Sequence, residues 1–249
     1  MFFNRFPLIR YNFGDNESGV VFNNLSVYVD LFDQLKDQVT YYEKYTIQDG
    51  DRPDVISQKL YGRSDYHWTF FLVNPALRES GWPLPERELR ELVKQRYPHR
   101  VITTEDEIAA KFLPGVNVVG KTSGTTGRII ERNLDLGQLV VASDKDGEGV
   151  NKSFISAEQI AAGDTIEEQA ANTINTIGEV VQYNSILHYK NSDKIIVDID
   201  PYDQVTSNLL PVTILNDYVE FNDNLKQISV IRPDAINPVV NEFFKLLSQ

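Results

Sequence analysis

The chain has 249 residues and a formal net charge of −12, and it contains no cysteine. The missing cysteines exclude disulfides, thiolate metal sites and cysteine nucleophiles, and the acidic balance disfavours a nucleic-acid surface, which needs clustered Lys and Arg. No apolar run approaches the roughly 20 residues of a transmembrane helix, and the first residues lack the pattern of a signal peptide, so we expect a soluble intracellular product.

Residues 1–23 carry aromatic side chains separated by polar residues and glycines. Such a segment cannot form a core by itself, so we expect an arm that packs against something else. The run from about Leu25 to Tyr42 is compatible with a helix after a short strand.

Residues 45–75 predict a strand, a turn and two helices. The turn is at Asp49-Gly50, because glycine adopts positive φ without steric cost. We expect Asp51 to cap the first helix, Gly62 to end it, and Ser64 or Asp65 to cap the second. The second helix carries one apolar stripe and ends at Asn74-Pro75; the stripe is Trp68, Phe71 and Leu72.

Two further helices are expected after this unit. Residues 85–97 are charged, with Glu early and Lys and Arg late, as the helix dipole prefers. A shorter helix is predicted from Glu105 to Phe112, with Thr104 as its N-cap.

Residues 105–170 predict a compact inserted domain of short antiparallel strands, resembling a small β-barrel. Apolar residues alternate at 116–118, 129–132 and 139–141, between glycine-containing turns. Strands are also expected within 174–183 and 195–199. A final helix is expected from Asn237 to Leu247; its apolar face is too wide for a free helix, so it should dock onto another surface.

A phosphate-loop pattern spans Gly115 to Thr122, with Gly120-Lys121-Thr122 as its end. A phosphate-binding loop needs a buried strand before it and a helix directly after it. Here Pro114 precedes the motif, and two glycines within Ser123–Gly127 oppose a helix. We therefore expect no nucleotide, and no other cofactor.

No other pattern assembles catalytic chemistry. His67, His99 and His188 are scattered without zinc-ligand spacing, and no serine elbow occurs. We expect no metal site, no small-molecule ligand and no enzyme activity.

Residues 45–75 resemble a LysM module, through Tyr45-Thr46-Ile47, the Asp49-Gly50-Asp51 turn, Leu60-Tyr61-Gly62 and Asn74-Pro75. A further similarity is carried by Arg52-Pro53, the aromatic second helix, Gly81-Trp82 and the start Phe2-Phe3-Asn4-Arg5-Phe6-Pro7. Through these residues the chain is similar to the LysM-containing baseplate wedge proteins of T-even-like contractile-tailed bacteriophages, the wedge protein fifty-three family. The similarity is good over residues 1–95, weak over about 105–170 and intermediate over the last 35 or so.

The resemblance implies a structural subunit of the virion that is made in the host cytoplasm. Such a subunit binds other wedge proteins, helps to join neighbouring wedges around the tail hub, and is present in six copies. Its contacts would extend to neighbouring wedges and the proteins of the hub and tube start, without nucleic acid or membrane. The expected interface residues are Phe2, Phe6, Tyr61, Trp68, Phe71, Trp82, Phe243 and Phe244. For Trp68 and Phe71, filling the module's own core is an equally good interpretation.

The alternative function is binding of peptidoglycan or chitin. LysM glycan binders use a shallow groove, which would correspond to Gln48–Asp54 and Val73–Leu77 here. The sequence shows no clear closing strand after Asn74-Pro75 and no second copy of the module, which places this function second.

The expected fold class is α+β, with a LysM-like strand-helix-helix module, an N-terminal arm, a β-barrel-like insertion and a C-terminal strand and helix segment. The expected regions are an arm and helix at 1–40, the LysM-like domain at 41–100, the inserted domain at 105–170 and the C-terminal region at 171–249.

Overall fold

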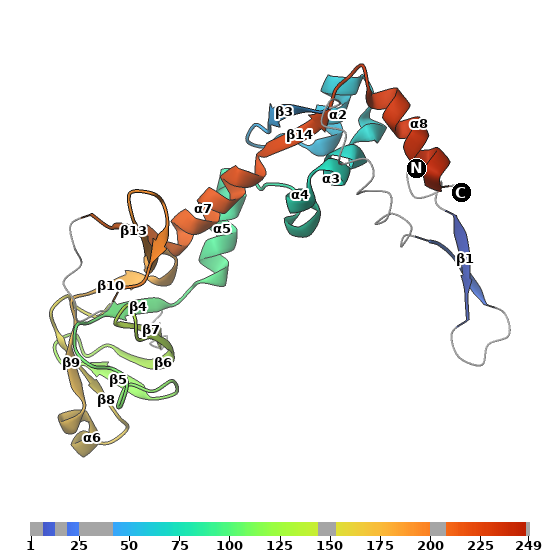
Figure 1. Ribbon diagram of the computed structural model, residues 1–249. Coiled ribbons are helices and arrows are strands. Elements are labelled where there is room, and N and C mark those ends of the chain that lie inside the picture. Colours follow the sequence, from blue (N-terminus) through green and yellow to red (C-terminus); the bar gives the residue numbers. More distant parts are fainter. Residues whose placement is uncertain (1–6, 13–18, 25–41, 144–152, 200–207, 248–249) are drawn as a thin grey trace. The chain divides into compact units, whose positions relative to one another are not determined.

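The computed structural model combines helices with several small sheets, which confirms the α+β class (Figure 1). It describes residues 7–12, 19–24, 42–143, 153–199 and 208–247. The chain forms two compact units: unit 1 comprises Met1–Glu86 with Phe221–Gln249, and unit 2 is Arg87–Glu220. The chain leaves unit 1 within one helix, α5 (Glu86–Arg96), and returns to it within another, α7 (Ile214–Leu225).

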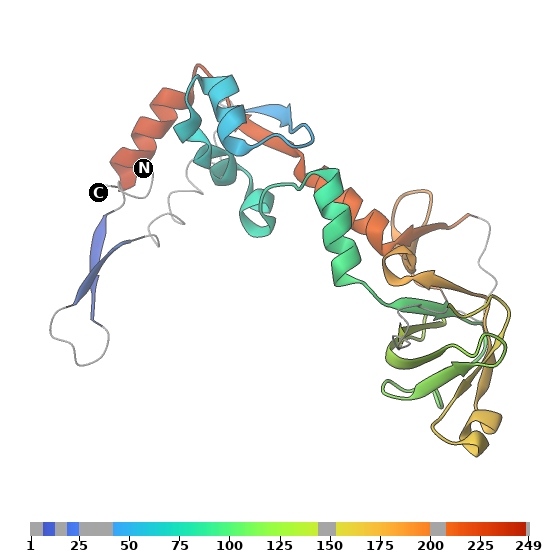
Figure 2. The same cartoon turned by 180° about the vertical axis from the view of Figure 1, so that it is seen from behind.

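Unit 1 is built around a two-stranded antiparallel sheet whose strands come from distant parts of the chain. Strand β3 (Tyr42–Thr46) pairs with β14 (Gln227–Ile231), with Gln227 opposite Thr46. Seen from behind in Figure 2, the orange-red β14 again lies beside the blue β3. The compact units therefore do not follow the four regions of the sequence analysis, because the end of the chain packs with residues 42–82.

The helices of unit 1 fill its core. They are α2 (Pro53–Tyr61), the 3-10 turn η3 (Ser64–Tyr66), α3 (Trp68–Val73), α4 (Pro75–Ser80) and α8 (Ile236–Leu247). Ile56 of α2 and Phe70 of α3 pack against Ile228 and Val230 of β14. The expected end of the first helix is confirmed, because Gly62 has φ 69° and its N–H donates to the Gln58 carbonyl.

Two expected helix caps are wrong. Helix α2 is capped by Arg52 without a side-chain bond, because the Asp51 carboxylate instead accepts the Gln48 N–H within the preceding turn (3.4 Å). Helix α3 begins after His67, because Ser64 and Asp65 lie in the separate turn η3. The expected end at Asn74-Pro75 is confirmed, and Pro75 opens α4.

The N-terminal arm contains a hairpin in its described part. Strand β1 (Leu8–Tyr11) pairs with β2 (Val20–Asn23), with Ile9 opposite Phe22. The segment expected as a helix from about Leu25 to Tyr42 lies outside the described residues, apart from Tyr42 itself, which begins β3.

Unit 2 contains a seven-stranded antiparallel sheet in the order β10-β4-β7-β6-β5-β8-β9. Its strands are β4 (Arg100–Thr103), β5 (Asn117–Gly120), β6 (Thr126–Asn133), β7 (Gln138–Ser143), β8 (Gln159–Ala162), β9 (Thr173–Asn175) and β10 (Gly178–Val181). The end strands β9 and β10 are separated only by Thr176 and Ile177, whose N–H groups donate to the Glu158 and Thr103 carbonyls. One run of chain thus touches both ends of the sheet, which closes around an apolar interior that includes Ile102, Val118 and Ile160.

The expected helix from Glu105 to Phe112 is wrong. The Thr104 hydroxyl accepts the Asp106 N–H and donates to the Asn175 carbonyl, and the Asp106 carboxylate accepts the Asn175 N–H at 2.6 Å. These bonds hold the segment against β9, so Thr104 and Asp106 do not begin a helix. Ile108 and Phe112, whose spacing resembles a helix face, are buried in the sheet's interior.

The remaining elements of unit 2 lie between β8 and β9, in the case of α6, or follow β10 in sequence. They are α6 (Ile166–Ala171), the 3-10 turn η4 (Gln182–Asn184), β11 (Ile186–Lys190), β12 (Ile196–Val197) and β13 (Leu210–Thr213). The strand expected at 195–199 is thus reduced to two residues, and the one expected within 174–183 is divided between β9 and β10. Across the described residues, no helix combines the length and the apolar character that a bilayer span needs.

Candidate functional site

Six of the eight expected interface residues lie in the described part of unit 1, and Phe2 and Phe6 lie outside the described residues. The six are Tyr61, Trp68, Phe71, Trp82, Phe243 and Phe244. They fall into two groups, one around α8 and one around the turn that follows β3.

The first group joins α3 to the C-terminal helix. The ring centroid of Trp68 lies 4.9 Å from that of Phe243 and 5.7 Å from that of Phe244. Trp68 is 7% exposed and Phe243 is fully buried, and both belong to a cluster with Leu72 and Ile231. The wide apolar face of α8 therefore docks within its own unit, and Trp68 fills the core, which was one of its two interpretations.

Tyr61 lies between the two groups. Its hydroxyl donates to the Ile231 carbonyl at 2.9 Å, and burial raises the pKa of the phenol far above its usual range. The ring contacts Tyr66 edge-on and stacks on Phe70. This side chain thus serves as a neutral donor that holds β14 against α2.

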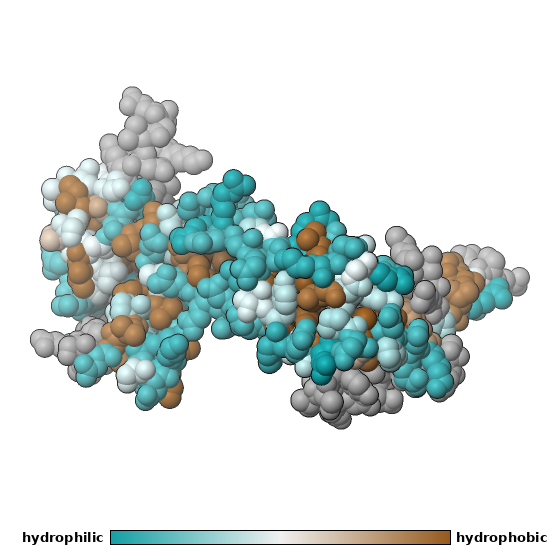
Figure 3. Space-filling view, turned by 90° about the horizontal axis from the view of Figure 1, so that it is seen from above, coloured by the Kyte–Doolittle hydropathy of each residue, from teal (hydrophilic) through white to brown (hydrophobic). Residues whose placement is uncertain are grey.

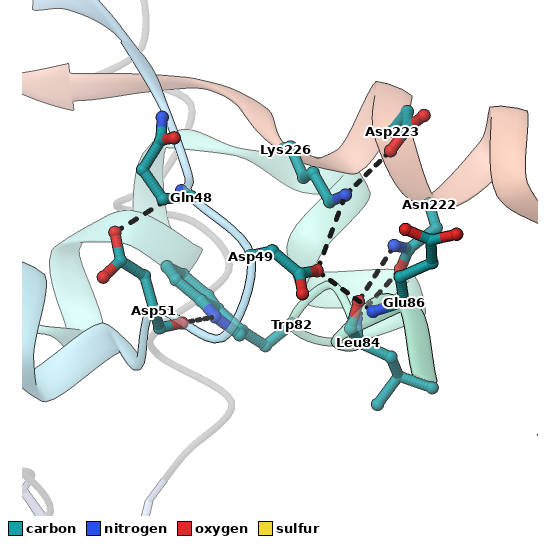
Figure 4. A network of polar contacts seen from close by, with 9 residues as sticks. All are labelled: Gln48, Asp49, Asp51, Trp82, Leu84, Glu86, Asn222, Asp223 and Lys226. Carbon is teal, nitrogen blue, oxygen red and sulfur yellow. Dashed lines mark hydrogen bonds and ion pairs between the residues drawn. The ribbon is translucent and has the colours of Figure 1, made fainter. Parts of the chain in front are cut away.

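The second group contains Trp82, in the segment between α4 and α5. Its indole N–H donates to the Asp51 carbonyl at 2.7 Å (Figure 4), and its ring lies 5.9 Å from Phe71 and 6.1 Å from Phe70. Phe71 and Trp82 are both half-buried. The segment 82–86 is thereby held over the turn 48–51.

Polar contacts on both sides fix this segment, as Figure 4 shows. The Asn222 amide accepts the Leu84 N–H at 2.9 Å and donates to the Leu84 carbonyl at 3.0 Å. The Asp49 carboxylate accepts the Glu86 N–H at 3.0 Å and lies 3.9 Å from the Lys226 ammonium. We call residues 82–86 the strap. The Trp82 indole, the Leu84 backbone and the Glu86 N–H all have protein partners, and these bonds hold the strap against the turn.

The phosphate-loop pattern lies in unit 2 and forms a hairpin. Residues 117–120 are strand β5, and a turn leads directly into strand β6, so no helix follows the motif. The N–H groups of Thr122 and Ser123 both donate to Glu158 Oε2, at 3.1 and 2.9 Å. The turn thus does bind an anion, but the anion is the protein's own carboxylate.

Glu158 is 4% exposed and accepts four donors in all. Burial by itself would raise its pKa, but the donors from Ser123, Ile155 and Thr122 outweigh burial and lower it. Gly120 permits the approach, since a Cβ there would lie 2.7 Å from both carboxylate oxygens. This site was missed in the sequence, where only the glycine and the motif signal it.

A second polar cluster in unit 2 involves Arg96, Tyr97 and Tyr218. The guanidinium donates to the Tyr218 hydroxyl at 2.9 Å, and the two hydroxyls lie 3.1 Å apart. Burial would raise the pKa of Tyr218, but the bonds from Tyr97 and Arg96 and the nearby positive charge lower it. The bond to Tyr218 raises the pKa of Tyr97. The cluster joins the end of α5 to α7 and carries no nucleophile–base pair.

His67 belongs to unit 1, and His99 and His188 belong to unit 2. His67 Nδ1 lies 2.9 Å from the Ser64 carbonyl, and His188 Nε2 is buried without a partner in the described structure. Nor does any cluster of three or more His, Asp or Glu in the described ranges have the arrangement of a metal site.

Among the described residues of unit 1, the hairpin β1–β2 carries the largest concentration of exposed apolar side chains. Leu8 is 70% exposed, Val21 55%, Val20 50% and Ile9 43%. Apolar surface of this kind is visible as brown atoms on the hairpin, towards the right of Figure 3. In the register of the pair, Leu8 and Val21 lie on one face of the hairpin and Ile9 and Val20 on the other, so both faces expose apolar side chains. Exposed apolar surface is typical of a site that binds another protein.

No known protein-family model matches the chain, and no curated protein matches it significantly.

Proposed function

We propose that the protein is a structural subunit of a phage tail baseplate wedge, which binds other wedge proteins and helps to join neighbouring wedges around the tail hub. The observation that carries this proposal is the apolar hairpin β1–β2, where Leu8, Val20 and Val21 are at least half exposed. A two-stranded hairpin is marginally stable by itself and is stabilised when a partner covers its exposed apolar side chains. The family resemblance supplies the identity of the partners.

The LysM-like module also belongs to this proposal. Its support is the order of elements in unit 1: strand β3, helices α2 and α3, and the antiparallel partner strand β14. In this interpretation the closing strand follows unit 2 instead of following Asn74-Pro75 directly. The turn and helix ends that carry the sequence resemblance lie in this same unit.

Glycan binding is the weaker alternative because the strap occupies the expected groove. The expected groove includes Gln48–Asp54, and Trp82 and Glu86 both donate hydrogen bonds to that turn. The other side of the groove would include Asn74, whose amide is bonded to Ser229. A sugar would have to displace these contacts. In a pull-down on insoluble peptidoglycan we expect the protein in the supernatant, and retention would favour the alternative.

Co-expression with the wedge proteins of the same virus, followed by size-exclusion chromatography with mass detection, tests the proposal. We expect co-elution in a large complex, and loss of the complex in the double variant Leu8→Ser, Val21→Ser. The matched control is Val55→Ser, which replaces an apolar side chain 49% exposed on α2, outside the hairpin. The proposed role would be refuted if the protein eluted as a monomer in the presence of every wedge protein. It would also be refuted if the hairpin variant still co-eluted with the wedge proteins.

A further inference from the structure

The two edges of the β3–β14 sheet differ in how their backbone groups are satisfied. In an antiparallel pair, opposite residues alternate between those that exchange both hydrogen bonds and those that direct both groups outward. The Ile47 N–H donates to the Lys226 carbonyl at 2.9 Å, just beyond the strand pair. The register then makes Tyr45–Ile228 and Glu43–Val230 the bonded pairs. Ser229 and Lys44, which lie opposite each other, direct their groups to the outer edges.

The outer edge of β14 is closed by side chains. The Asn74 amide accepts the Ser229 N–H and donates to the Ser229 carbonyl, both at 2.8 Å. The Tyr61 hydroxyl donates to the Ile231 carbonyl at 2.9 Å. No further strand can pair along this edge without displacing these bonds.

The outer edge of β3 has no such closure at its centre. Within the described ranges, no group bonds the N–H or carbonyl of Lys44, and Lys44 and Thr46 are exposed. Two residues further along, the Thr46 carbonyl accepts a local bond from the Gln48 amide at 3.2 Å. An unpaired strand edge is a template for another extended segment.

We infer that β3 is a docking edge for an extended segment of a partner protein, which adds to the sheet as a third strand next to Lys44. An extended segment in antiparallel orientation satisfies both backbone groups of Lys44 with one residue, which donates to the Lys44 carbonyl and accepts the Lys44 N–H. This inference does not depend on the proposed role in a virion.

The two faces of the sheet define the side chains of that segment. Lys44 and Thr46 lie on a polar face, where they bond Ser229 and Gln227 across the strands. Tyr45 lies on the opposite face and packs half-buried against the core cluster of Ile56 and Phe70. The residue opposite Lys44 should therefore be polar, and its neighbour opposite Tyr45 apolar, so that it extends the core over Tyr45; the other neighbour lies opposite the exposed Glu43.

Amide hydrogen exchange on the full chain tests this with the peptide acetyl-KVTVTVK-amide, whose central Thr is flanked by Val. In the free monomer the Lys44 amide should exchange fast and the Tyr45 amide slowly. At about ten times the dissociation constant of the peptide, the Lys44 amide should exchange about tenfold more slowly. The control peptide is N-methylated at the central Thr, which removes the donor to the Lys44 carbonyl and should abolish the protection.

The matched variants are Lys44→Ala, which keeps the N–H and should bind, and Lys44→Pro, which removes an outward N–H and should not. If Lys44→Pro fails to fold, the N-methylated peptide still decides the question on the wild-type chain. Slow exchange of Lys44 in the free monomer would overturn the inference, since the chain itself would then cover the edge. Protection that appears only when the protein dimerises would assign the edge to a second copy and also overturn it. The inference would also be overturned if both peptides protected the Lys44 amide equally, or if neither protected it at the highest soluble peptide concentration.

Discussion

The amide side chain of Asn74 holds the backbone of Ser229 through two hydrogen bonds of 2.8 Å, although the residues are 155 positions apart. The same amide donates to the Phe70 carbonyl at 2.7 Å and thereby also caps the end of α3. One side chain thus connects the end of the second helix to the strand that completes the sheet, across a part of the chain that forms a separate unit.

Replacing Asn74 should destabilise unit 1. Asn74→Ala leaves the Ser229 N–H and two carbonyls without partners in a part-buried place, which should cost about 1–3 kcal/mol. Asn74→Asp should cost at least as much at neutral pH, because a carboxylate would face the Phe70 and Ser229 carbonyls. Urea unfolding followed by tryptophan fluorescence measures this, since both tryptophans of the chain, Trp68 and Trp82, lie in unit 1.

The control for this prediction is Asn224→Ala, an exposed position on α7. It should be neutral or slightly stabilising, because alanine is the better helix former. If Asn74→Ala unfolds at the same urea concentration as the wild type, the bonds to Ser229 do not stabilise the sheet.

Unit 1 should fail to fold when the chain ends at Lys226. That truncation removes β14 and α8, and with them the buried side chains of Ile228, Val230 and Phe243. The tryptophan emission should shift to that of exposed indole, while the amides of β5, β6 and β8 in unit 2 stay protected from exchange. Ending the chain after Lys245 is the control. Native emission from the shorter chain would show that β14 is dispensable.

The elements predicted correctly from the sequence are those specified by local signals. Gly62 ends α2 because only a residue that tolerates positive φ fits there, and the charge order of residues 86–96 matches helix α5. Alternating apolar residues between turns indicated β5, β6 and β7. In each case the deciding residues lie within one element.

The elements that were missed depend on distant partners. Strand β14 is stabilised by pairing with β3 and by Asn74, neither of which is visible in its own five residues. Its absence from the prediction left the module without a closing strand and placed the chain's end in a separate region. Helix α7 did have a local signal, since Ile214, Leu215 and Leu225 are buried at helical spacing. The contacts of Trp82 and Trp68 also depend on distant partners, since Trp82 bonds Asp51 and Trp68 packs against Phe243 and Phe244 of the C-terminal helix.

Glu158→Gln should destabilise unit 2 at neutral pH. The glutamine amide keeps one oxygen acceptor, but it loses the negative charge and directs an NH₂ group towards the N–H and O–H donors. We therefore expect the free energy of unfolding to fall by about 1–3 kcal/mol. Glu107→Gln, at an exposed position, is the control and should be neutral. Because unit 2 contains no tryptophan, hydrogen exchange of the β5 and β8 amides is the suitable measurement. Equal protection in Glu158→Gln and wild type would contradict the prediction.

The pH dependence of the same site has a defined sign. The pKa of Glu158 is lower in the folded chain than the value of about 4.3 expected when unfolded. The carboxylate therefore stabilises the fold above that unfolded value, and this contribution is lost as the pH falls through the folded pKa. The difference in stability between wild type and Glu158→Gln should accordingly shrink on acidification below pH about 4.3 and stay constant above it. A difference that grows towards acid would mean that the folded pKa is raised.

Trp68 and Phe71 should differ in their roles although they are three residues apart. Trp68 is 7% exposed and contacts Phe243 and Phe244, so Trp68→Ala should cost about 3–5 kcal/mol through the cavity it leaves. Phe71 is half-buried against Trp82, and Phe71→Ala should cost less, about 1–2 kcal/mol. Urea unfolding followed by circular dichroism measures both without relying on the removed indole. Trp68→Phe, which keeps an aromatic ring, should recover much of the loss and leave assembly with wedge proteins unchanged. If Trp68→Phe folds normally but abolishes that assembly, Trp68 is a partner contact and not a core residue.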